Sequence, residues 1–357
     1  MNLSELRQNI DRVDAQIVSL LKERSSYVRG VGEIKKEVNA PIFVPEREQA
    51  LLEKIETLNA GVLPNQSLLS IYREIISCGY AQEGNLTIAY LGPPGTWSHQ
   101  AAIKQFGRSV TLIDKPNFSD IFDMVERGQA DYGIVPLENS SNGAVTPVMD
   151  LFIQSPLKIC AQVHLSIKNG LMAKIPREQI KTIYSHPQVL GQCHDWLLRH
   201  FPEADLVETS STTKAALIAL QQADKGAAAL GTPLAAELFD LTLLEEDVQD
   251  KSNNTTRFAV LGHQTTLPTG KDRTSLLFHI HHRPGTLVDA LDCFRKHGID
   301  LIRIESRPSK VINWEYVFYV DTVGHALEEP LKSALAEQEQ HCSILKILGS
   351  YPQVNLI

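Results

Sequence analysis

The sequence lacks the features that mark several other classes of protein. Its 357 residues contain five cysteines, and these form no Cys-x-x-Cys pair and no spacing typical of zinc ligands. No apolar run approaches the roughly twenty residues of a membrane span, and the N-terminal residues lack a basic segment followed by an apolar one. The formal net charge of -8 disfavours a surface for nucleic acid or anionic lipid. We therefore expect a cytoplasmic protein that acts on small molecules and needs no metal or cofactor.

The chain has enough apolar residues, 43%, to build two or three ordinary cores. Between Leu6 and Ile34 apolar residues recur at steps of four and three, with Arg24 in place of one of them. This pattern predicts a long amphipathic helix, and further helices are expected after Pro45 and over residues 67–82. Because a single long helix has little to pack against, the apolar seam favours dimerisation.

Charged residues on the inward faces of these helices indicate an anion-binding pocket. Lys35 follows Arg24 by three turns on nearly the same face, about 16 Å along the axis, so both side chains can close around a small dianion. Arg7 lies about 25 Å from Arg24 and can serve such a ligand only in a partner chain. Glu48 and Glu83 also point inward. The alternative is that Arg7 and Lys35 are ordinary solvated charges.

Residues 86–263 alternate apolar runs with helical stretches, which is typical of an α/β fold. Small polar residues follow several of the expected strands, where ligands of such folds bind. These loops span residues 92–98, 136–140, 185–188 and 208–212. The first loop has neither a G-x-G-x-x-G pattern nor the lysine of a P-loop, so nucleotide binding is not supported.

The polar stretch at residues 252–260 runs directly into an expected buried strand. An arginine such as Arg257 can hold a planar carboxylate by paired hydrogen bonds, and the hydroxyl of Thr256 can donate to a departing oxygen. That chemistry suits an acidic substrate that loses water. Taken alone, the stretch also fits a turn whose side chains bond their own backbone. The four polar loops together with this strand favour a site.

The last part of the chain has the pattern of a small separate module. Residues 264–272 are expected to form a linker. Over residues 273–351 the order of expected elements is βαββα with a final strand, which predicts a ferredoxin-like fold.

Over essentially its whole length the chain resembles bifunctional chorismate mutase/prephenate dehydratases. The resemblance implies a multidomain protein with an all-α mutase domain at 1–84, a two-lobed α/β dehydratase domain like a periplasmic binding protein at 86–263, a linker at 264–272, and an α+β ACT regulatory domain at 273–351. The family's mutase pocket corresponds to Arg7, Arg24, Lys35, Val44, Arg47, Glu48, Gly79 and Glu83. Val44 and Gly79 depart from an acidic residue and a serine, and Glu83 is often glutamine in the family.

The motifs of the dehydratase and ACT regions are specific. The dehydratase resemblance rests on residues 91–96, residues 136–140, residues 185–188 with Gln192, and residues 254–258. The site residues that it implies are Thr96, Glu138, Asn139, Ser140, Asn254, Thr256, Arg257 and Phe258. The ACT resemblance implies a phenylalanine site at Gly285, Thr286, Leu287, Glu305, Ser306 and Arg307.

The resemblance implies two reactions and feedback inhibition by phenylalanine. Chorismate would be rearranged to prephenate without covalent catalysis, and prephenate would lose carbon dioxide and water to give phenylpyruvate. The enzyme is expected to be a homodimer or a higher oligomer, with Arg7 supplied by the other chain. One rival, a mutase fused to a prephenate dehydrogenase, requires a nicotinamide fingerprint that the sequence does not contain. A second rival is a mutase fused to a non-catalytic sensor of an aromatic acid.

Overall fold

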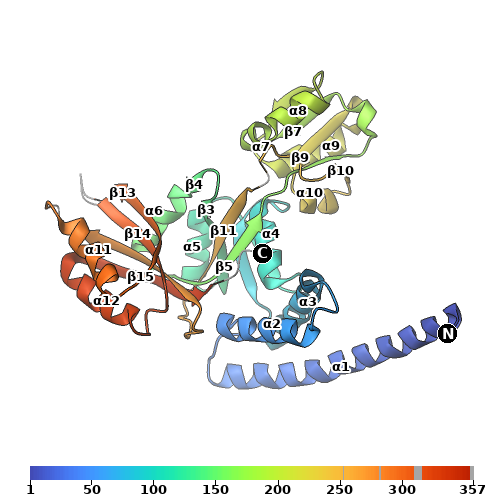
Figure 1. Cartoon of the computed structure of the whole chain (residues 1–357). Helices are drawn as coiled ribbons and strands as arrows, with labels where there is room; N and C mark the ends of the chain where they lie inside the picture. The colour runs from blue at the N-terminus through green and yellow to red at the C-terminus, as the bar shows by residue number, and fades with distance from the viewer. Residues whose placement is uncertain (252, 281–282, 309–315, 354–357) are drawn as a thin grey trace. The chain divides into compact units, whose positions relative to one another are not determined.

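The computed structural model describes residues 1–251, 253–280, 283–308 and 316–353 (Figure 1). Residue 252, where the polar stretch begins, lies outside the described residues. The chain divides into two compact units. One contains residues 1–87 with 106–111, and the other contains residues 88–105 with 112–357. Among the described residues, no helix combines the length and the apolar character needed to cross a membrane.

The first unit contains the three expected helices: α1 (Leu3–Glu37), α2 (Pro45–Asn59) and α3 (Asn65–Glu83). Asn2 caps α1 by accepting a hydrogen bond from the amide of Glu5, whose carboxylate accepts one from Asn2 in return. Pro45 begins α2, where its missing N–H costs no helical hydrogen bond. The helical prediction for this region is confirmed.

Helix α1 packs on α3 near its C-terminal end and leaves its apolar seam exposed. Only Gly32 is buried in α1, and a Cβ there would lie 2.9 Å from the Cα of Glu83, so glycine allows the two helices to approach. Large apolar residues along α1 are more than a third exposed. They are Leu6, Ile10, Val13, Ile17, Leu20, Tyr27, Val31 and Ile34. Such a continuous exposed apolar face is typical of an interaction surface.

The second unit begins with a lobe built on a mixed sheet in the order β2-β1-β3-β11-β5, with β4 paired to β3. Its strands are β1 (Thr87–Leu91), β2 (Thr111–Lys115), β3 (Tyr132–Asn139), β4 (Gly143–Ala144), β5 (Lys158–Ser166) and β11 (Thr255–Gly262). Its helices are α4 (Trp97–Phe106), α5 (Phe118–Glu126) and α6 (Thr146–Gln154). Strand β11 returns from the second lobe and lies antiparallel to both β3 and β5. The polar start of β11 is thereby placed beside the end of β3.

The second lobe is a five-stranded sheet in the order β10-β6-β9-β7-β8. Its strands are β6 (Gly170–Ala173), β7 (Thr182–Ser185), β8 (Asp205–Glu208), β9 (Ala227–Gly231) and β10 (Thr242–Glu245). The helical elements are η1 (Arg177–Gln179), α7 (Pro187–Gln192), α8 (His194–His200), α9 (Thr212–Gln221), η2 (Ala223–Lys225) and α10 (Pro233–Leu238). The chain leaves the first lobe after β5 and returns to it at β11, so two connections join the lobes. The expected two-lobed α/β architecture is confirmed.

The third sheet has the order β13-β14-β12-β15 and two helices. Its elements are β12 (Asp272–Ile280), α11 (Thr286–Lys296), β13 (Leu301–Pro308), β14 (Tyr316–Val323), α12 (Leu331–Gln338), η3 (Glu339–His341) and β15 (Cys342–Pro352). This is the expected ferredoxin-like order. Strand β13 is an edge strand, and Ile302 and Ile304 on it are exposed.

The third sheet shares a hydrophobic core with the first lobe. Leu277, Val317 and Leu348 belong to the same buried cluster as Val135 and Phe152. Polar contacts reinforce this packing. The hydroxyl of Tyr319 donates to the Met149 carbonyl at 2.6 Å, and Lys346 Nζ donates to the Ser155 carbonyl at 2.6 Å. Within residues 264–272, Thr266 is buried and its carbonyl lies 3.1 Å from His325 Nε2. This segment is therefore packed against the fold along part of its length.

Candidate active sites and regulatory site

The helical unit brings Arg24, Lys35 and Glu83 to the same side of the α1–α3 contact. Lys35 Nζ donates to Glu83 Oε2 at 2.7 Å and to the carbonyl of Ile42 at 2.7 Å. Arg24 Nη1 lies 3.5 Å from the carbonyl of Ile75. Glu83 is only 9% exposed, so its interaction with Lys35 is partly shielded from water. Two cations and a carboxylate thus line one inward face.

Glu48 is buried on α2 and is held by two side chains from α3. Its carboxylate accepts hydrogen bonds from the guanidinium of Arg73 and the hydroxyl of Tyr80. Burial and the nearby Glu48 carboxylate raise the pKa of Tyr80 well above its usual value, so the phenol stays protonated and donates. The sequence analysis did not include Arg73. Its position two turns before Tyr80, on the same face of α3, was the available signal.

The other expected mutase residues are less closely grouped. A Cβ at Gly79 would lie 3.5 Å from Val28 Cγ1 and 3.9 Å from Arg24 Nη1, so this position faces α1. Val44 immediately precedes α2, whereas Arg47 is exposed on its first turn. Arg7 is exposed near the start of α1, about 42 Å along the axis from Lys35. The structure therefore does not bring Arg7 to Lys35 or Glu83 of its own chain.

In the first lobe, Asn139 connects two expected dehydratase residues. Its Nδ2 donates to Asn254 Oδ1 at 2.7 Å and to Thr256 Oγ1 at 2.8 Å. Its Oδ1 accepts from the amides of Ser141 and Asn142, which fixes the orientation of the side-chain amide. Because Thr256 Oγ1 accepts the bond from Asn139, its hydroxyl proton can be directed to another acceptor. This arrangement is compatible with the predicted role of Thr256 as a donor.

Ser140 fixes the backbone around this cluster. Its hydroxyl donates to the Asn253 carbonyl at 3.0 Å and accepts from the Thr255 amide at 2.9 Å. Its own amide donates to the Thr255 carbonyl at 2.9 Å. The end of β3 and the start of β11 are thereby held together by side-chain and backbone bonds. The structure gives Ser140 a positioning role.

The loop after β1 connects the two lobes through threonines. Thr96 Oγ1 donates to the Leu91 carbonyl at 2.9 Å, which closes the loop on itself. Thr213 Oγ1 donates to the Pro94 carbonyl at 2.8 Å, and Thr232 Oγ1 donates to the Gly95 carbonyl at 2.6 Å. The sequence analysis missed both of these threonines. Thr232 directly follows β9, so the rule that selected the other polar loops would also have found it.

Arg257 lies on the face of β11 opposite to Thr256, because successive residues of a strand point to opposite sides. It is only 2% exposed. Its Nη2 lies 2.6 Å from Asp321 Oδ2, and its Nε lies 3.1 Å from Glu138 Oε1. Phe258 is buried in the core. The structure does not bring Arg257 together with Thr256, and its expected contact with a substrate carboxylate stays a prediction.

The residues expected to bind phenylalanine lie at the start of helix α11 and on strand β13. Gly285 has a φ of 90° and precedes α11, which begins with Thr286 and Leu287. A positive φ of this size favours glycine. Glu305, Ser306 and Arg307 lie on the edge strand β13. Ser306 is exposed, whereas Arg307 Nη1 donates to Thr146 Oγ1 of α6 at 2.8 Å.

Matches to family models and to known relatives show which family the chain belongs to. Residues 6–84 match the family model of chorismate mutase type II, residues 88–266 match that of prephenate dehydratase, and residues 274–340 match that of the ACT domain. A bifunctional chorismate mutase/prephenate dehydratase from Aquifex aeolicus is 44% identical over 359 residues, which cover 99% of each chain. The chain belongs to this bifunctional family. It is an enzyme with two catalytic domains and one ACT domain, and the rival of a mutase fused to a sensor is not favoured.

Solved structures resemble the larger part of the chain. A prephenate dehydratase from Arthrobacter aurescens in complex with L-Phe is 33% identical with a TM-score of 0.70, over 75% of this chain and 90% of that one. A protein described as a quorum quenching acylase, GqqA, is 27% identical with a TM-score of 0.70, over 75% of this chain and 98% of that one. Together with the family model matched by residues 88–266, the likeness to the solved prephenate dehydratase supports the dehydratase fold for these residues.

Proposed function

We propose that this protein catalyses two consecutive steps toward phenylalanine. The helical domain rearranges chorismate to prephenate, and the two-lobed domain converts prephenate to phenylpyruvate, carbon dioxide and water. The observation that carries this proposal is the match of both catalytic domains over 99% of a named bifunctional relative. The free thiols of all five cysteines fit a reducing compartment such as the cytoplasm.

In the mutase site, Arg24 and Lys35 hold the carboxylates of chorismate in a compact conformer, which lowers the entropic barrier to rearrangement. Lys35 and Glu83 meet the charge that develops on the ether oxygen. Glu48 orients the ring hydroxyl, and Arg73 and Tyr80 hold its carboxylate. Val44 and Arg47, at the start of α2, border the same pocket.

The pocket is completed by Arg7 of a second chain. Two observations support this assignment. Arg7 lies far from Lys35 on the same helix, and the apolar seam between them is exposed along α1. Burying these side chains against another copy stabilises association by roughly 25 cal/mol for each Å² removed from water. A homodimer formed through α1 therefore buries the exposed apolar seam and brings Arg7 of one chain to Lys35 of the other.

In the dehydratase site, Thr256 donates its proton to the departing ring hydroxyl of prephenate. The ring carboxylate leaves as carbon dioxide, and its electron pair moves into the ring and expels the hydroxyl, which departs as water. Aromatisation supplies most of the driving force, and Thr256 regains a proton from solvent. Asn139 and Asn254 orient the hydroxyl, while Ser140 and Thr96 hold the loops on which these residues lie.

Phenylalanine regulates the dehydratase through the ACT domain. The backbone around Gly285, Thr286 and Leu287 binds the amino acid against Glu305, Ser306 and Arg307 of a second copy. The exposed edge strand β13, with Ile302 and Ile304, supports such a pairing of two ACT domains. This assembly places the regulatory site apart from the catalytic residues of β3 and β11.

One assay tests the whole proposal. Purified full-length protein is supplied with chorismate, and the appearance of phenylpyruvate is followed by ultraviolet absorption with and without phenylalanine. We expect turnover of both chorismate and prephenate, and inhibition by phenylalanine but not by glycine. Binding of prephenate without turnover would support the sensor. Competitive inhibition against prephenate would place phenylalanine in the catalytic site instead.

A further inference from the structure

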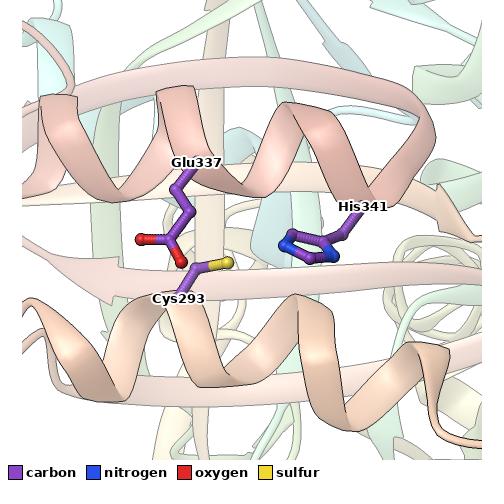
Figure 2. A group of neighbouring side chains, drawn as sticks. All are labelled: Cys293, Glu337 and His341. Atoms are coloured by element: carbon purple, nitrogen blue, oxygen red, sulfur yellow. The ribbon is translucent and has the colours of Figure 1, made fainter.

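Three potential metal ligands meet between the two helices of the ACT domain. Cys293 comes from α11, Glu337 from α12 and His341 from η3, and one ligand atom of each lies within 4.8 Å of the others. Figure 2 shows the Cys293 sulfur between the Glu337 carboxylate and the His341 ring, in the gap between the helices. These residues have no part in the proposed catalysis or phenylalanine binding.

The helices set this geometry. Glu337 and His341 are four residues apart and therefore lie on the same side of the α12–η3 segment, facing Cys293 on α11. In tetrahedral zinc sites, bond lengths of about 2.0–2.3 Å separate ligand atoms by about 3.5 Å. Since the three ligand atoms lie within 4.8 Å of one another, the contraction required is at most about 1.3 Å, which side-chain rotation can supply. The backbone already brings the three groups together.

The chemistry of the three side chains suits a divalent ion of borderline softness. Thiolate, imidazole and carboxylate are all zinc ligands, whereas magnesium prefers oxygen ligands alone. A Cys293 thiolate and a Glu337 carboxylate exactly neutralise one divalent cation, while His341 binds as a neutral ring. Cys293 is buried, and Glu337 and His341 are half-buried, so a neutral complex fits the position better than separate charges.

The neighbouring charges are compatible with an ion. Glu337 Oε1 lies 2.7 Å from Lys296 Nζ, and Glu337 Oε2 lies 3.1 Å from His297 Nε2. These contacts lower the pKa of Glu337, so its carboxylate is ionised at neutral pH. Lys296 also lies 3.7 Å from Asp292 and retains this partner when Glu337 binds a metal. Burial, followed by Glu337, raises the pKa of Cys293, so metal binding must displace the thiol proton to solvent.

We propose that Cys293, Glu337 and His341 form a zinc site that ties α11 to the end of α12. Water completes the coordination, because Glu337 and His341 are partly open to solvent. The ion connects the helix that begins beside Gly285 to the segment that enters β15. It stabilises the ACT domain in its folded state.

The test uses full-length protein freed of metal by a chelator and then equilibrated with buffered Zn²⁺. We expect one Zn²⁺ per chain by elemental analysis, and a thermal midpoint that rises with Zn²⁺ but not with Mg²⁺. Cys293→Ser and His341→Ala should each lower the affinity at least about tenfold. Cys78→Ser and His194→Ala are matched controls on an exposed cysteine and an exposed histidine elsewhere, and both should bind Zn²⁺ normally.

Cobalt supplies a measurement on the wild-type protein that does not depend on how well the variants fold. Co²⁺ bound at this site should give a near-ultraviolet sulfur-to-cobalt charge-transfer band, which disappears on addition of Zn²⁺. A wild-type protein that binds no Zn²⁺, a cobalt complex without the sulfur band, or unchanged affinity in both ligand variants would each overturn the proposal.

Discussion

Arg257 and Asp321 form a buried ion pair that joins the dehydratase lobe to the ACT domain, with 2.6 Å between Nη2 and Oδ2. Arg257 comes from β11 and Asp321 from β14. Glu138 on β3 binds Arg257 and also lies 3.0 Å from the Nε of Arg303 on β13. Strand β11 therefore has the Thr256 hydroxyl on one face and a charged contact with the regulatory sheet on the other. Because Thr256 and Arg257 are consecutive residues of β11, a shift of Arg257 at that contact also moves the backbone of Thr256.

Removing the Asp321 charge tests this link. Asp321→Asn leaves the buried guanidinium of Arg257 with Glu138 as its remaining carboxylate partner among the described residues. We therefore expect a loss of about 3 kcal/mol in the free energy of unfolding. Inhibition of the dehydratase by phenylalanine should weaken as well. Denaturant midpoints and phenylalanine titrations measure the two effects. Asp240→Asn, which removes a carboxylate that is 95% exposed and paired with Lys174, is the control and should alter neither. A stable variant with normal inhibition would contradict the link.

The Thr256 hydroxyl is expected to be essential for dehydration. Thr256→Val keeps the shape of the side chain but removes the donor, so dehydratase turnover should fall about a hundredfold or more. The mutase of the same protein is an internal control and should be unchanged. Thr256→Ser retains a hydroxyl and should recover much of the activity. If the valine variant turns over within a few-fold of wild type, Thr256 is only a structural residue of the strand.

The shared mutase site predicts complementation between two inactive variants. Arg7→Ala removes the residue given to the partner, and Arg24→Ala removes one used in the chain's own pocket. After exchange of subunits in an equal mixture, about a quarter of the mutase sites should be intact, because half of the dimers are mixed and each has one complete site. Mutase turnover of the mixture against each pure variant is the measurement. No recovery after proven exchange would show that Arg7 acts within its own chain or not at all.

His164 should make the stability of the second unit depend on pH. Burial, Arg257, Arg273 and Lys104 lower its pKa to about 4 in the folded protein. An unfolded histidine titrates near about 6.5, so the unfolded chain gains a proton first as pH falls from 7. Stability is therefore lost toward acid, by at most about 1.4 kcal/mol per pH unit and by less because the ring is partly solvated.

The test for His164 compares chemical unfolding of wild type and His164→Gln at pH 7 and pH 5. Both proteins lose stability through other groups, but wild type should lose more because only it has the histidine. An equal loss in the two proteins would mean that His164 is protonated as readily in the folded chain as in the unfolded one.

The sequence by itself determined the elements whose patterns are local. The seam from Leu6 to Ile34 predicted α1, and the order of strands and helices after residue 272 predicted the ferredoxin-like module, as the structure confirms. Spacing on one helix also predicted that Arg24 and Lys35 share a face and that Arg7 does not reach them. The predictions of α1 and of the ferredoxin-like module succeeded because helix and strand periods depend only on neighbouring residues.

Only the tertiary structure decided which distant residues meet. The sequence predicts that Arg257 binds a substrate carboxylate, and this stays a prediction, whereas its ion pair with Asp321 follows only from the packing of the ACT sheet. The thiol of Cys293 meets Glu337 and His341 only because two helices far apart in the chain lie side by side. No spacing within the sequence encodes such contacts, because they depend on how sheets and helices pack and not on the period of any one element.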